Sequence, residues 1–160
     1  MTVERMWSPM HLIIDARCQN QQVMTDKHLL SKWIIRLCHV IGMTPVGPVH
    51  TISFPFPGSD KPAISACQFL GESAIVAHPY PEFDYMYLDV FSCKEFDTEK
   101  AVEFIQRTLK VTESTIHLFQ RGIDMETRAP VPLREVRLEI EEKLRILDAG
   151  YKAGLHQFGG

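Results

Sequence analysis

The chain has 160 residues, of which 45% are apolar and 23% are charged, a composition typical of a globular protein rather than a disordered one. This length suits one domain with a single sizeable core and is short for two. The formal net charge is -3 and the Lys and Arg residues are scattered, which argues against a nucleic-acid-binding protein.

The first part of the chain predicts a strand followed by a long helix. Residues 10–15 are apolar and partly β-branched, which predicts a strand. Thr25 is suited to cap the helix at its start, and Gly42 is suited to end it. The helix itself is predicted by apolar residues at three- and four-residue spacing, namely Leu29, Leu30, Trp33, Ile34, Leu37, Val40 and Ile41.

Four strands, a second helix and a final strand follow. Apolar runs separated by Pro- and Gly-rich segments predict strands at residues 46–54, 63–70, 73–78 and 84–92. Asp97 is suited to cap the second helix. The apolar face of this helix comprises Ala101, Val102, Phe104, Ile105 and Leu109. Residues 114–119 predict the last strand, so the predicted order is βαββββαβ.

This order predicts an α+β fold in which an antiparallel sheet carries both helices on one face. The other face of the sheet then needs a cover, which a second copy of the chain could supply. We therefore expect a homodimer that forms an αββα sandwich. The sequence gives no sign of an internal repeat or a low-complexity segment.

The C-terminal part differs in character from the rest. Residues 121–131 are polar and contain proline, which predicts a boundary between a domain at 1–123 and an extension at 124–160. Within the extension an apolar stripe predicts an amphipathic helix, through Leu133, Val136, Ile140, Leu144 and Leu147. Such a helix usually packs on its own domain or on a neighbour, and a regulatory role is the alternative.

Cysteine and histidine spacing predicts neither a disulfide framework nor a metal site. The four cysteines, Cys18, Cys38, Cys67 and Cys93, lie far apart with no CxxC pair. The histidines show no ligand spacing either. The N-terminus mixes Glu4, Arg5 and Asp15 into what would have to be an apolar signal segment, and no apolar run has the length of a membrane span. We therefore expect a cytoplasmic protein without a membrane anchor and with reduced thiols.

The segment LGESAIVAHPYPE, residues 70–82, predicts a hairpin that places polar residues at its two ends. If Gly71 and Glu72 form the turn, with glycine supplying unusual backbone angles, Leu70 pairs with Ser73 and Ser65 lies opposite His78. His78 is then about 16 Å from Ser73 along the strand. The next strand runs back and brings Cys93 toward Ser73.

One chain thus carries two half-sites: Ser73 and Cys93 at one end, and Ser65, His78 and Glu82 at the other. A two-fold pairing of antiparallel protomers would bring each half-site against its complement and create two composite sites. A simpler interpretation is a hairpin with an exposed serine, a hydrogen-bonded histidine and a buried cysteine that acts as a small apolar residue.

These residues resemble the bacterial and archaeal S-adenosylmethionine decarboxylase proenzyme family, in which the pattern S-x6-ES-x4-H-x2-PE is followed by DVF-[ST]-C. The chain matches it with Ser65, with the pair Glu72 and Ser73, with His78, with Pro81 and Glu82, and with LDVFSC ending at Cys93. The resemblance covers roughly residues 10–122.

The resemblance implies that the chain cuts itself between Glu72 and Ser73. The Ser73 hydroxyl would attack the Glu72 carbonyl, with the Ser65 hydroxyl of the partner supporting the oxyanion. His78 of the partner would then remove the serine α-proton. Residue 73 would become a covalent pyruvoyl group, the cofactor that forms a Schiff base with the substrate, and Cys93 would donate a proton to the product.

The same resemblance implies a substrate site. Glu82 is suited to accept hydrogen bonds from ribose hydroxyls, and Phe56 and Tyr80 are suited to stack on adenine or to face a sulfonium charge. The chain departs from the family pattern here, with Ala74 after Ser73, with Pro79 and Tyr80 before the Pro-Glu pair, and with a longer segment at 56–65.

The resemblance therefore implies a decarboxylase that acts on S-adenosylmethionine and supplies the aminopropyl donor for spermidine synthesis. The departures leave two alternatives. One is the same chemistry on arginine or ornithine, for which Glu82 could pair with a cationic side chain. The other is a non-catalytic paralogue that regulates an active one.

Overall fold

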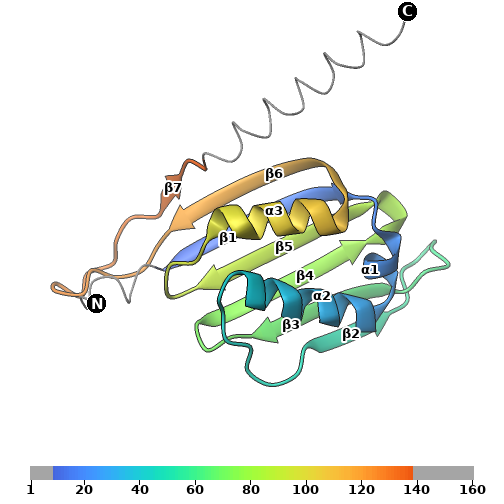
Figure 1. The fold of residues 1–160 in the computed structure, drawn as a ribbon, viewed down its shortest axis with the longest axis horizontal. Coiled ribbons are helices and arrows are strands. Elements are labelled where there is room, and N and C mark those ends of the chain that lie inside the picture. Colours follow the sequence, from blue (N-terminus) through green and yellow to red (C-terminus); the bar gives the residue numbers. More distant parts are fainter. Residues whose placement is uncertain (1–8, 139–160) are drawn as a thin grey trace, which may run out of the picture.

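The computed structural model describes residues 9–138 and confirms an α+β fold with one antiparallel sheet. The sheet order is β2-β3-β4-β5-β1-β6-β7, and the helices of the described chain lie on one face of it (Figure 1). The strands are β1 (Met10–Cys18), β2 (His50–Phe54), β3 (Ala63–Phe69), β4 (Ser73–Tyr80), β5 (Tyr85–Ser92), β6 (Val111–Gln120) and β7 (Arg134–Val136). The helices are α1 (Gln21–Thr25), α2 (Lys27–Val40), α3 (Thr98–Leu109) and a short 3-10 helix, η2 (Pro81–Phe83).

The core lies between the sheet and the two long helices. Alternate residues of β1 are buried on this side, among them Leu12 and Ile14. Helix α2 contributes Leu30 and Ile34, and α3 contributes Ile105, all with no exposed area. Because strand side chains alternate with a period of two, the intervening residues of each strand lie on the face without helices.

The two long helices begin at carboxylate caps. Asp97 caps α3 as predicted, and its Oδ1 accepts a hydrogen bond from the Lys100 amide at 3.0 Å. The prediction that Thr25 caps α2 is wrong, because Asp26 accepts from the amide of His28 at 2.8 Å. Thr25 instead ends α1, a short helix that the sequence pattern did not predict.

Several strand boundaries differ from the prediction. Strands β1, β3 and β4 end at Cys18, Phe69 and Tyr80 rather than at residues 15, 70 and 78. Strand β2 begins at His50 rather than at residue 46, because Gly47 has a φ of +70° and a proline follows it. Strand β5 begins at Tyr85 rather than at residue 84, because Asp84 is left-handed with a φ of 52°. Strand β6 spans Val111–Gln120 and is longer at both ends than predicted.

The predicted C-terminal helix is wrong for its first turn. Arg134–Val136 forms β7, which pairs antiparallel with β6 and places Val136 opposite Leu118. Leu133, just before β7, is exposed. The remaining positions of the predicted stripe, Ile140, Leu144 and Leu147, lie outside the described residues. Residues that are apolar at helical spacing can therefore serve a sheet edge when a partner strand is present.

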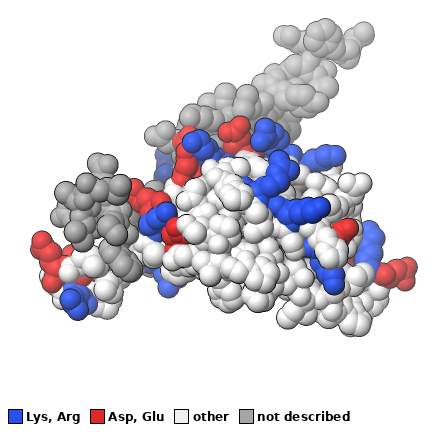
Figure 2. All heavy atoms as spheres, turned by 60° about the horizontal axis from the view of Figure 1, so that its bottom comes forward, with Lys and Arg blue, Asp and Glu red and all other residues white. Residues whose placement is uncertain are grey.

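The face of the sheet without helices carries several large apolar side chains. Val76, Tyr87 and Ile52 are respectively 41%, 45% and 67% exposed, and Phe54 and Phe69 are exposed on the same face. Figure 2 turns the molecule so that the edge at the bottom of Figure 1 comes forward; charged side chains lie along the upper part and toward both ends of this view, and uncharged ones cover much of its centre.

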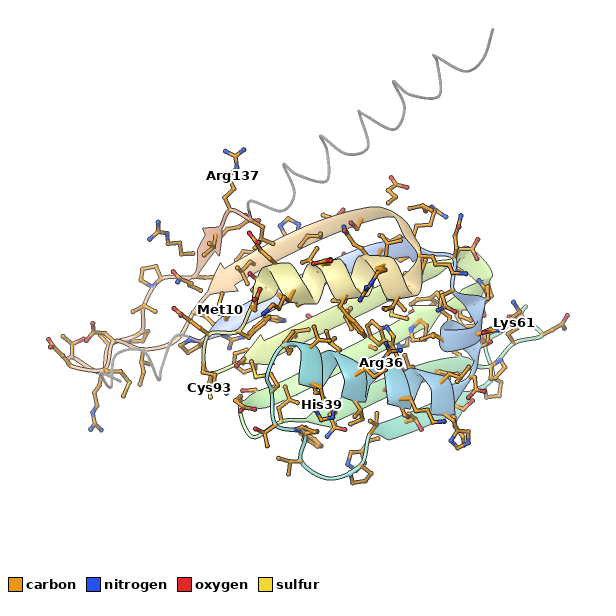
Figure 3. The ribbon with its side chains drawn as sticks, viewed as in Figure 1. Met10, Arg36, His39, Lys61, Cys93 and Arg137 are labelled. Carbon is orange, nitrogen blue, oxygen red and sulfur yellow. The ribbon has the colours of Figure 1, made fainter. Side chains whose placement is uncertain are left out.

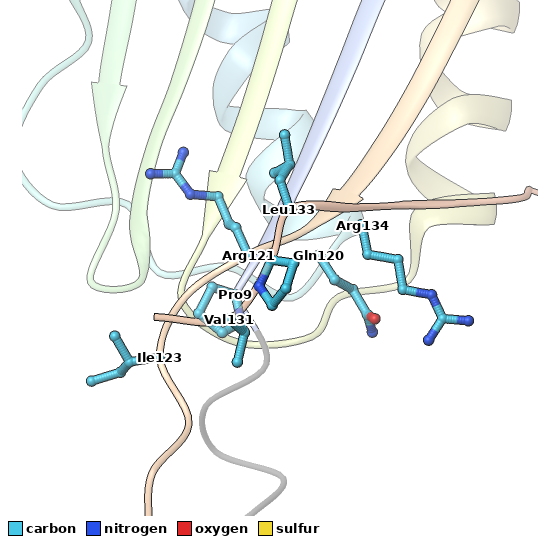
Figure 4. Close-up of a pocket in the computed structure, with 8 residues that line it drawn as sticks. Pro9, Gln120, Arg121, Ile123, Val131, Leu133 and Arg134 are labelled. Atoms are coloured by element: carbon cyan, nitrogen blue, oxygen red, sulfur yellow. The ribbon is translucent and has the colours of Figure 1, made fainter. Parts of the chain in front are cut away.

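A sharp corner follows β6 and shapes a hollow beside the end of the sheet. Figure 4 shows this hollow of about 580 Å³, with Arg121 and Leu133 among its lining residues. The Arg121 guanidinium lies 4.6 Å from the centre of the Phe91 ring. Gly122 makes the corner with a φ of +126°, and a Cβ atom there would lie 2.9 Å from Cγ of Pro9.

We expect Gly122→Ala to lower the free energy of unfolding by about 2 kcal/mol or more, because a side chain at this φ is strained and also meets Pro9. Gly47→Ala is the matched control: its φ is +70° in open space, so only the left-handed backbone is penalised, by about 1 kcal/mol. Urea unfolding in a Ser73→Ala background, which lacks the hydroxyl expected to cut the chain, measures both. Equal losses for the two variants would contradict the Pro9 contact.

Candidate active site

The hairpin of β3 and β4 has the predicted register. Ala66 lies opposite Ala77, and Phe69 lies opposite Ala74. At the turn, the Leu70 amide donates to the Ser73 carbonyl oxygen at 2.9 Å. The prediction that Gly71 supplies an unusual backbone angle at this turn is wrong, because Gly71 does not have a positive φ. Its amide instead donates to the Thr44 carbonyl oxygen at 2.8 Å, so this corner is held by a neighbouring loop.

Ser73 and Cys93 lie at the same end of the sheet, as predicted. Ser73 pairs with Ser92 across β4 and β5, and Cys93 is the next residue after β5. The Cys93 amide donates a hydrogen bond of 2.8 Å to the Glu72 carbonyl oxygen. This carbonyl belongs to the peptide bond between Glu72 and Ser73, so a backbone donor already addresses the group that a serine hydroxyl would attack.

The Glu72 side chain is held on the other side of the same turn. Its Oε2 accepts from the Thr44 amide at 3.0 Å, and its Oε1 lies 3.0 Å from Nζ of Lys94. Burial raises the pKa of this carboxyl group, but the hydrogen bonds from Thr44 and Lys94 outweigh burial and leave the pKa below its ordinary value. The residue before the proposed cleavage point is therefore charged and fixed.

Ser65 and His78 meet on the face without helices, near the end of β4 that is remote from Ser73. Their side chains are joined by a 2.5 Å hydrogen bond between the Ser65 Oγ and the His78 Nδ1. The imidazole packs between two rings, stacked on Phe54 at 6.4 Å and edge-on to Tyr80 at 4.6 Å between centroids. The predicted pairing of Ser65 with His78 is thus realised as a direct contact.

The three residues predicted to bind substrate lie near this pair. Tyr80 and Phe56 are in edge-to-face contact, with centroids 6.1 Å apart. Tyr80 also lines a shallow pocket of about 270 Å³ together with Phe83, Tyr85 and Tyr87. Glu82 lies in η2 beside this pocket, and both of its carboxyl oxygens are buried without a hydrogen-bond partner within the described part of the chain.

A loop from the β2–β3 connection is tied to η2. Lys61 Nζ donates to Oε1 of Gln21 at 3.2 Å, and Nε2 of Gln21 donates to the Pro81 carbonyl oxygen at 3.0 Å. The same side-chain nitrogen, Nε2 of Gln21, also donates to Oδ1 of Asp84 at 2.5 Å. These contacts fix the segment that carries Glu82.

The two half-sites of one chain stay apart. Figure 3 labels Cys93 at one end of the sheet and Lys61 near the other. His78 is five residues beyond Ser73 on β4, which corresponds to about 16 Å. Alternation also places the Ser73 side chain on the same side as Ile75, while His78 lies on the face without helices. The peptide bond between Glu72 and Ser73 comes just before β4, at the end of the sheet.

Sequence reasoning missed several residues of these half-sites. Thr44 and Lys94 contact Glu72, and Phe54 stacks on His78. Lys94 follows Cys93 directly in the chain, so its proximity to the turn was available as a signal. Thr44 offered none, because it lies in a loop 28 residues before its partner.

Cys93 and Cys67 differ from the other two cysteines in being only partly buried. All four are free thiols. Burial raises the pKa of the Cys18 thiol to about 12 and that of the Cys38 thiol to about 11, so these two are held as neutral core groups. Cys93 is therefore the thiol with both access and a position next to the turn.

Two further searches cover residues 9–138 alone. Within this range no three His, Cys, Asp or Glu side chains are grouped so as to hold a metal ion. The helices of the described part are all too short or too polar to cross a membrane.

The comparisons with known proteins agree with this geometry. A sequence model of the S-adenosylmethionine decarboxylase family matches residues 10–122, and the chain belongs to this family. The chain is 30% identical over 112 residues to an arginine decarboxylase proenzyme of Aeropyrum pernix, covering 69% of this chain and 81% of the relative. It is 28% identical over 117 residues to an S-adenosylmethionine decarboxylase proenzyme of Pyrococcus furiosus, covering 72% and 80%.

A solved structure shows the same fold. The crystal structure of the adenosylmethionine decarboxylase from Aquifex aeolicus aligns with a TM-score of 0.61 at 18% sequence identity. The alignment covers 75% of this chain and 95% of that one. The likeness therefore extends over nearly the whole of the smaller protein.

Proposed function

We propose that the protein is a pyruvoyl-dependent decarboxylase that makes its own cofactor by cutting the bond between Glu72 and Ser73, and that its substrate is S-adenosylmethionine. The observation that carries the proposal is the Cys93 amide on the Glu72 carbonyl oxygen, at the turn where the family pattern places the cut. The relatives are named proenzymes, which supports self-cleavage.

The cleavage needs only water and groups from two copies of this chain. The Ser73 Oγ attacks the Glu72 carbonyl carbon, and the Cys93 amide supports the negative charge that develops on the carbonyl oxygen. Breaking the C–N bond turns the amide into an ester and frees the α-amine. Removal of the α-proton by His78 expels the Glu72 carboxylate. The dehydroalanine that remains takes up water and loses ammonia, which leaves a pyruvoyl group at residue 73.

His78 and Ser65 of the same chain are too far from Ser73 to take part, so we assign these roles to a second protomer. Two chains packed antiparallel through the faces without helices would form an αββα sandwich with two shared sites. The exposed apolar side chains on that face, such as Val76 and Tyr87, support this arrangement because water contact with them is unfavourable.

The surrounding residues fit a pyruvoyl group and its substrate. The group arises from Ser73 itself, and when present it supplies a ketone that accepts electrons as carbon dioxide leaves. Cys93 is placed to return a proton to the substrate carbon. Phe56 and Tyr80 of the partner offer aromatic faces for adenine or the sulfonium. The buried carboxyl oxygens of Glu82 could accept hydrogen bonds from the ribose hydroxyls of the substrate.

Arginine is the second candidate substrate. The Aeropyrum pernix relative is named an arginine decarboxylase proenzyme, and a guanidinium group would satisfy both Glu82 oxygens at once. Ornithine is a third possibility by the same logic of charge. A non-catalytic regulatory paralogue has no physical need for the set of Ser65, Ser73, His78 and Cys93.

The proposal extends to the chain as a whole. We place the decarboxylase in residues 1–123, in the cytoplasm, and treat residues 124–160 as an extension. No nucleic acid and no metal ion takes part in the proposed reaction.

Denaturing electrophoresis tests the cut. We expect the purified protein to run as two chains, residues 1–72 and 73–160, and Ser73→Ala to run as one, because the variant lacks the nucleophile. The mass of the second fragment should be lower by one ammonia than that of a chain beginning with serine. Ser53→Ala, on the exposed strand β2, is the control and should cut normally. Two fragments from Ser73→Ala would contradict the assignment of the nucleophile.

Mixing two inactive variants tests the shared site. A Ser73→Ala protomer co-expressed with a His78→Ala protomer should restore one complete site in each mixed dimer. Only the His78→Ala chain should then acquire the pyruvoyl mass, because it retains Ser73 and meets an intact His78 on its partner. Absence of that mass from the co-expressed pair, while the wild-type protein acquires it, would reject the two-protomer arrangement.

Release of carboxyl-labelled carbon dioxide from S-adenosylmethionine, arginine and ornithine, measured side by side, tests the substrate. We expect the largest kcat/KM for S-adenosylmethionine and a KM about tenfold higher in Glu82→Gln, because the amide keeps only one acceptor oxygen. Glu103→Gln, on the exposed side of α3, should leave KM unchanged. A larger kcat/KM for arginine would contradict S-adenosylmethionine as the substrate, and it would leave the proposal of self-cleavage unaffected.

A further inference from the structure

The carboxylate of Glu72 has more contacts than a residue at an exposed turn needs. We propose that Thr44 and Lys94, which we call the Glu72 clamp, position the bond between Glu72 and Ser73 for self-cleavage. Neither residue belongs to the pattern on which the family resemblance was recognised. The inference rests on the proposed function, since it assigns residues to the same cut.

Thr44 fixes the two residues that precede the bond. Its carbonyl oxygen accepts from the Gly71 amide at 2.8 Å, and its amide donates to Oε2 of Glu72 at 3.0 Å. Its hydroxyl adds a third hydrogen bond, to Oε1 of Glu72 at 3.2 Å. Both main chain and side chain of the turn are thereby tied to the loop after α2. An attacking hydroxyl needs its target carbonyl held in one orientation, and these contacts supply that.

Lys94 acts through its charge. Its Nζ lies 3.0 Å from Oε1 of Glu72, whose side chain is only 13% exposed. Attack on the Glu72 carbonyl creates a negative charge within the residue that already carries the carboxylate. In a partly buried site these two negative charges repel strongly unless a nearby cation offsets the repulsion. The ammonium of Lys94 offsets that repulsion during attack.

The two neighbouring residues Cys93 and Lys94 contact both the main-chain carbonyl and the side-chain carboxylate of Glu72. The Cys93 amide donates to the carbonyl oxygen, and the next residue, Lys94, pairs with the carboxylate. Shifting this segment would loosen both contacts together. The clamp therefore acts at the first step, the transfer of the acyl group from nitrogen to oxygen. His78 acts later, at the removal of the α-proton, so the two residues can be told apart by the step that fails.

The experiment follows fresh precursor made by cell-free synthesis, with the conversion of the 160-residue chain into two fragments measured over time. Lys94→Met should slow cleavage about tenfold or more, and Lys94→Arg should stay within about twofold of wild type because the charge is kept. Thr44→Val, which removes only the hydroxyl, should slow cleavage less. Lys100→Met is the control: Lys100 is exposed and pairs with Asp97, and its loss should leave the rate of cleavage unchanged.

Hydroxylamine separates a positioning role from later effects. It cleaves an accumulated ester, so it should release fragments from His78→Ala, which stops after the acyl shift. It should release none from Lys94→Met beyond its slow basal rate, because that variant forms little ester. Thermal midpoints in a Ser73→Ala background check that the variants fold. Should Lys94→Met prove unfolded, Lys94→Gln takes its place in the same comparison.

The outcomes distinguish the two claims. If wild type never cuts, the proposed function fails. If wild type cuts and a folded Lys94→Met cuts at the same rate, or if hydroxylamine rescues Lys94→Met as it does His78→Ala, the clamp is overturned. Slow cleavage in Lys94→Met, together with a near wild-type rate in Lys94→Arg, supports the positioning role of the Glu72 clamp.

Discussion

The hydrogen bond from the Cys93 amide to the Glu72 carbonyl oxygen ties the proposed self-cleavage of this protein to its fold. It exists because β4 and β5 pair in one register, with Ser73 opposite Ser92. A slip of one residue would turn every side chain of a strand to the opposite face and would remove the donor from the carbonyl. The buried alternation of Ile75, Ala77, Leu88 and Val90 under the helices opposes such a slip.

The length of β4 sets the second constraint. A strand of eight residues holds Ser73 and His78 rigidly apart, so a single sheet cannot bring the proposed nucleophile and the proposed base together. The exposed apolar face that carries His78 suggests how the gap is closed, since covering this face with a second copy brings opposite ends together. In the proposed dimer, assembly and chemistry thus depend on the same surface.

Glu72 at the β3–β4 turn and Glu82 in η2 differ in whether their carboxyl oxygens have hydrogen-bond partners. Glu72 is surrounded by donors from Thr44 and Lys94, which keep its pKa low and its side chain fixed. Glu82 has both oxygens buried and no donor within the described residues. A buried carboxyl group without a partner is costly, and a substrate carrying hydroxyl groups or a positive charge would remove that cost.

Features that depend on local pattern could be predicted from the sequence alone. The α+β class, the long helices and the pairing of Ser65 with His78 follow from side-chain periodicity and from counting outward from a turn, which involve residues close in the chain. The sequence also placed Ser73 and Cys93 at one end, since a strand that turns back must return there. The aromatic partners of His78, the clamp on Glu72 and the strand β7 were decided only by tertiary structure. Each depends on segments far apart in the chain, such as Thr44 and Glu72, whose meeting is fixed by packing of the whole sheet rather than by neighbouring residues.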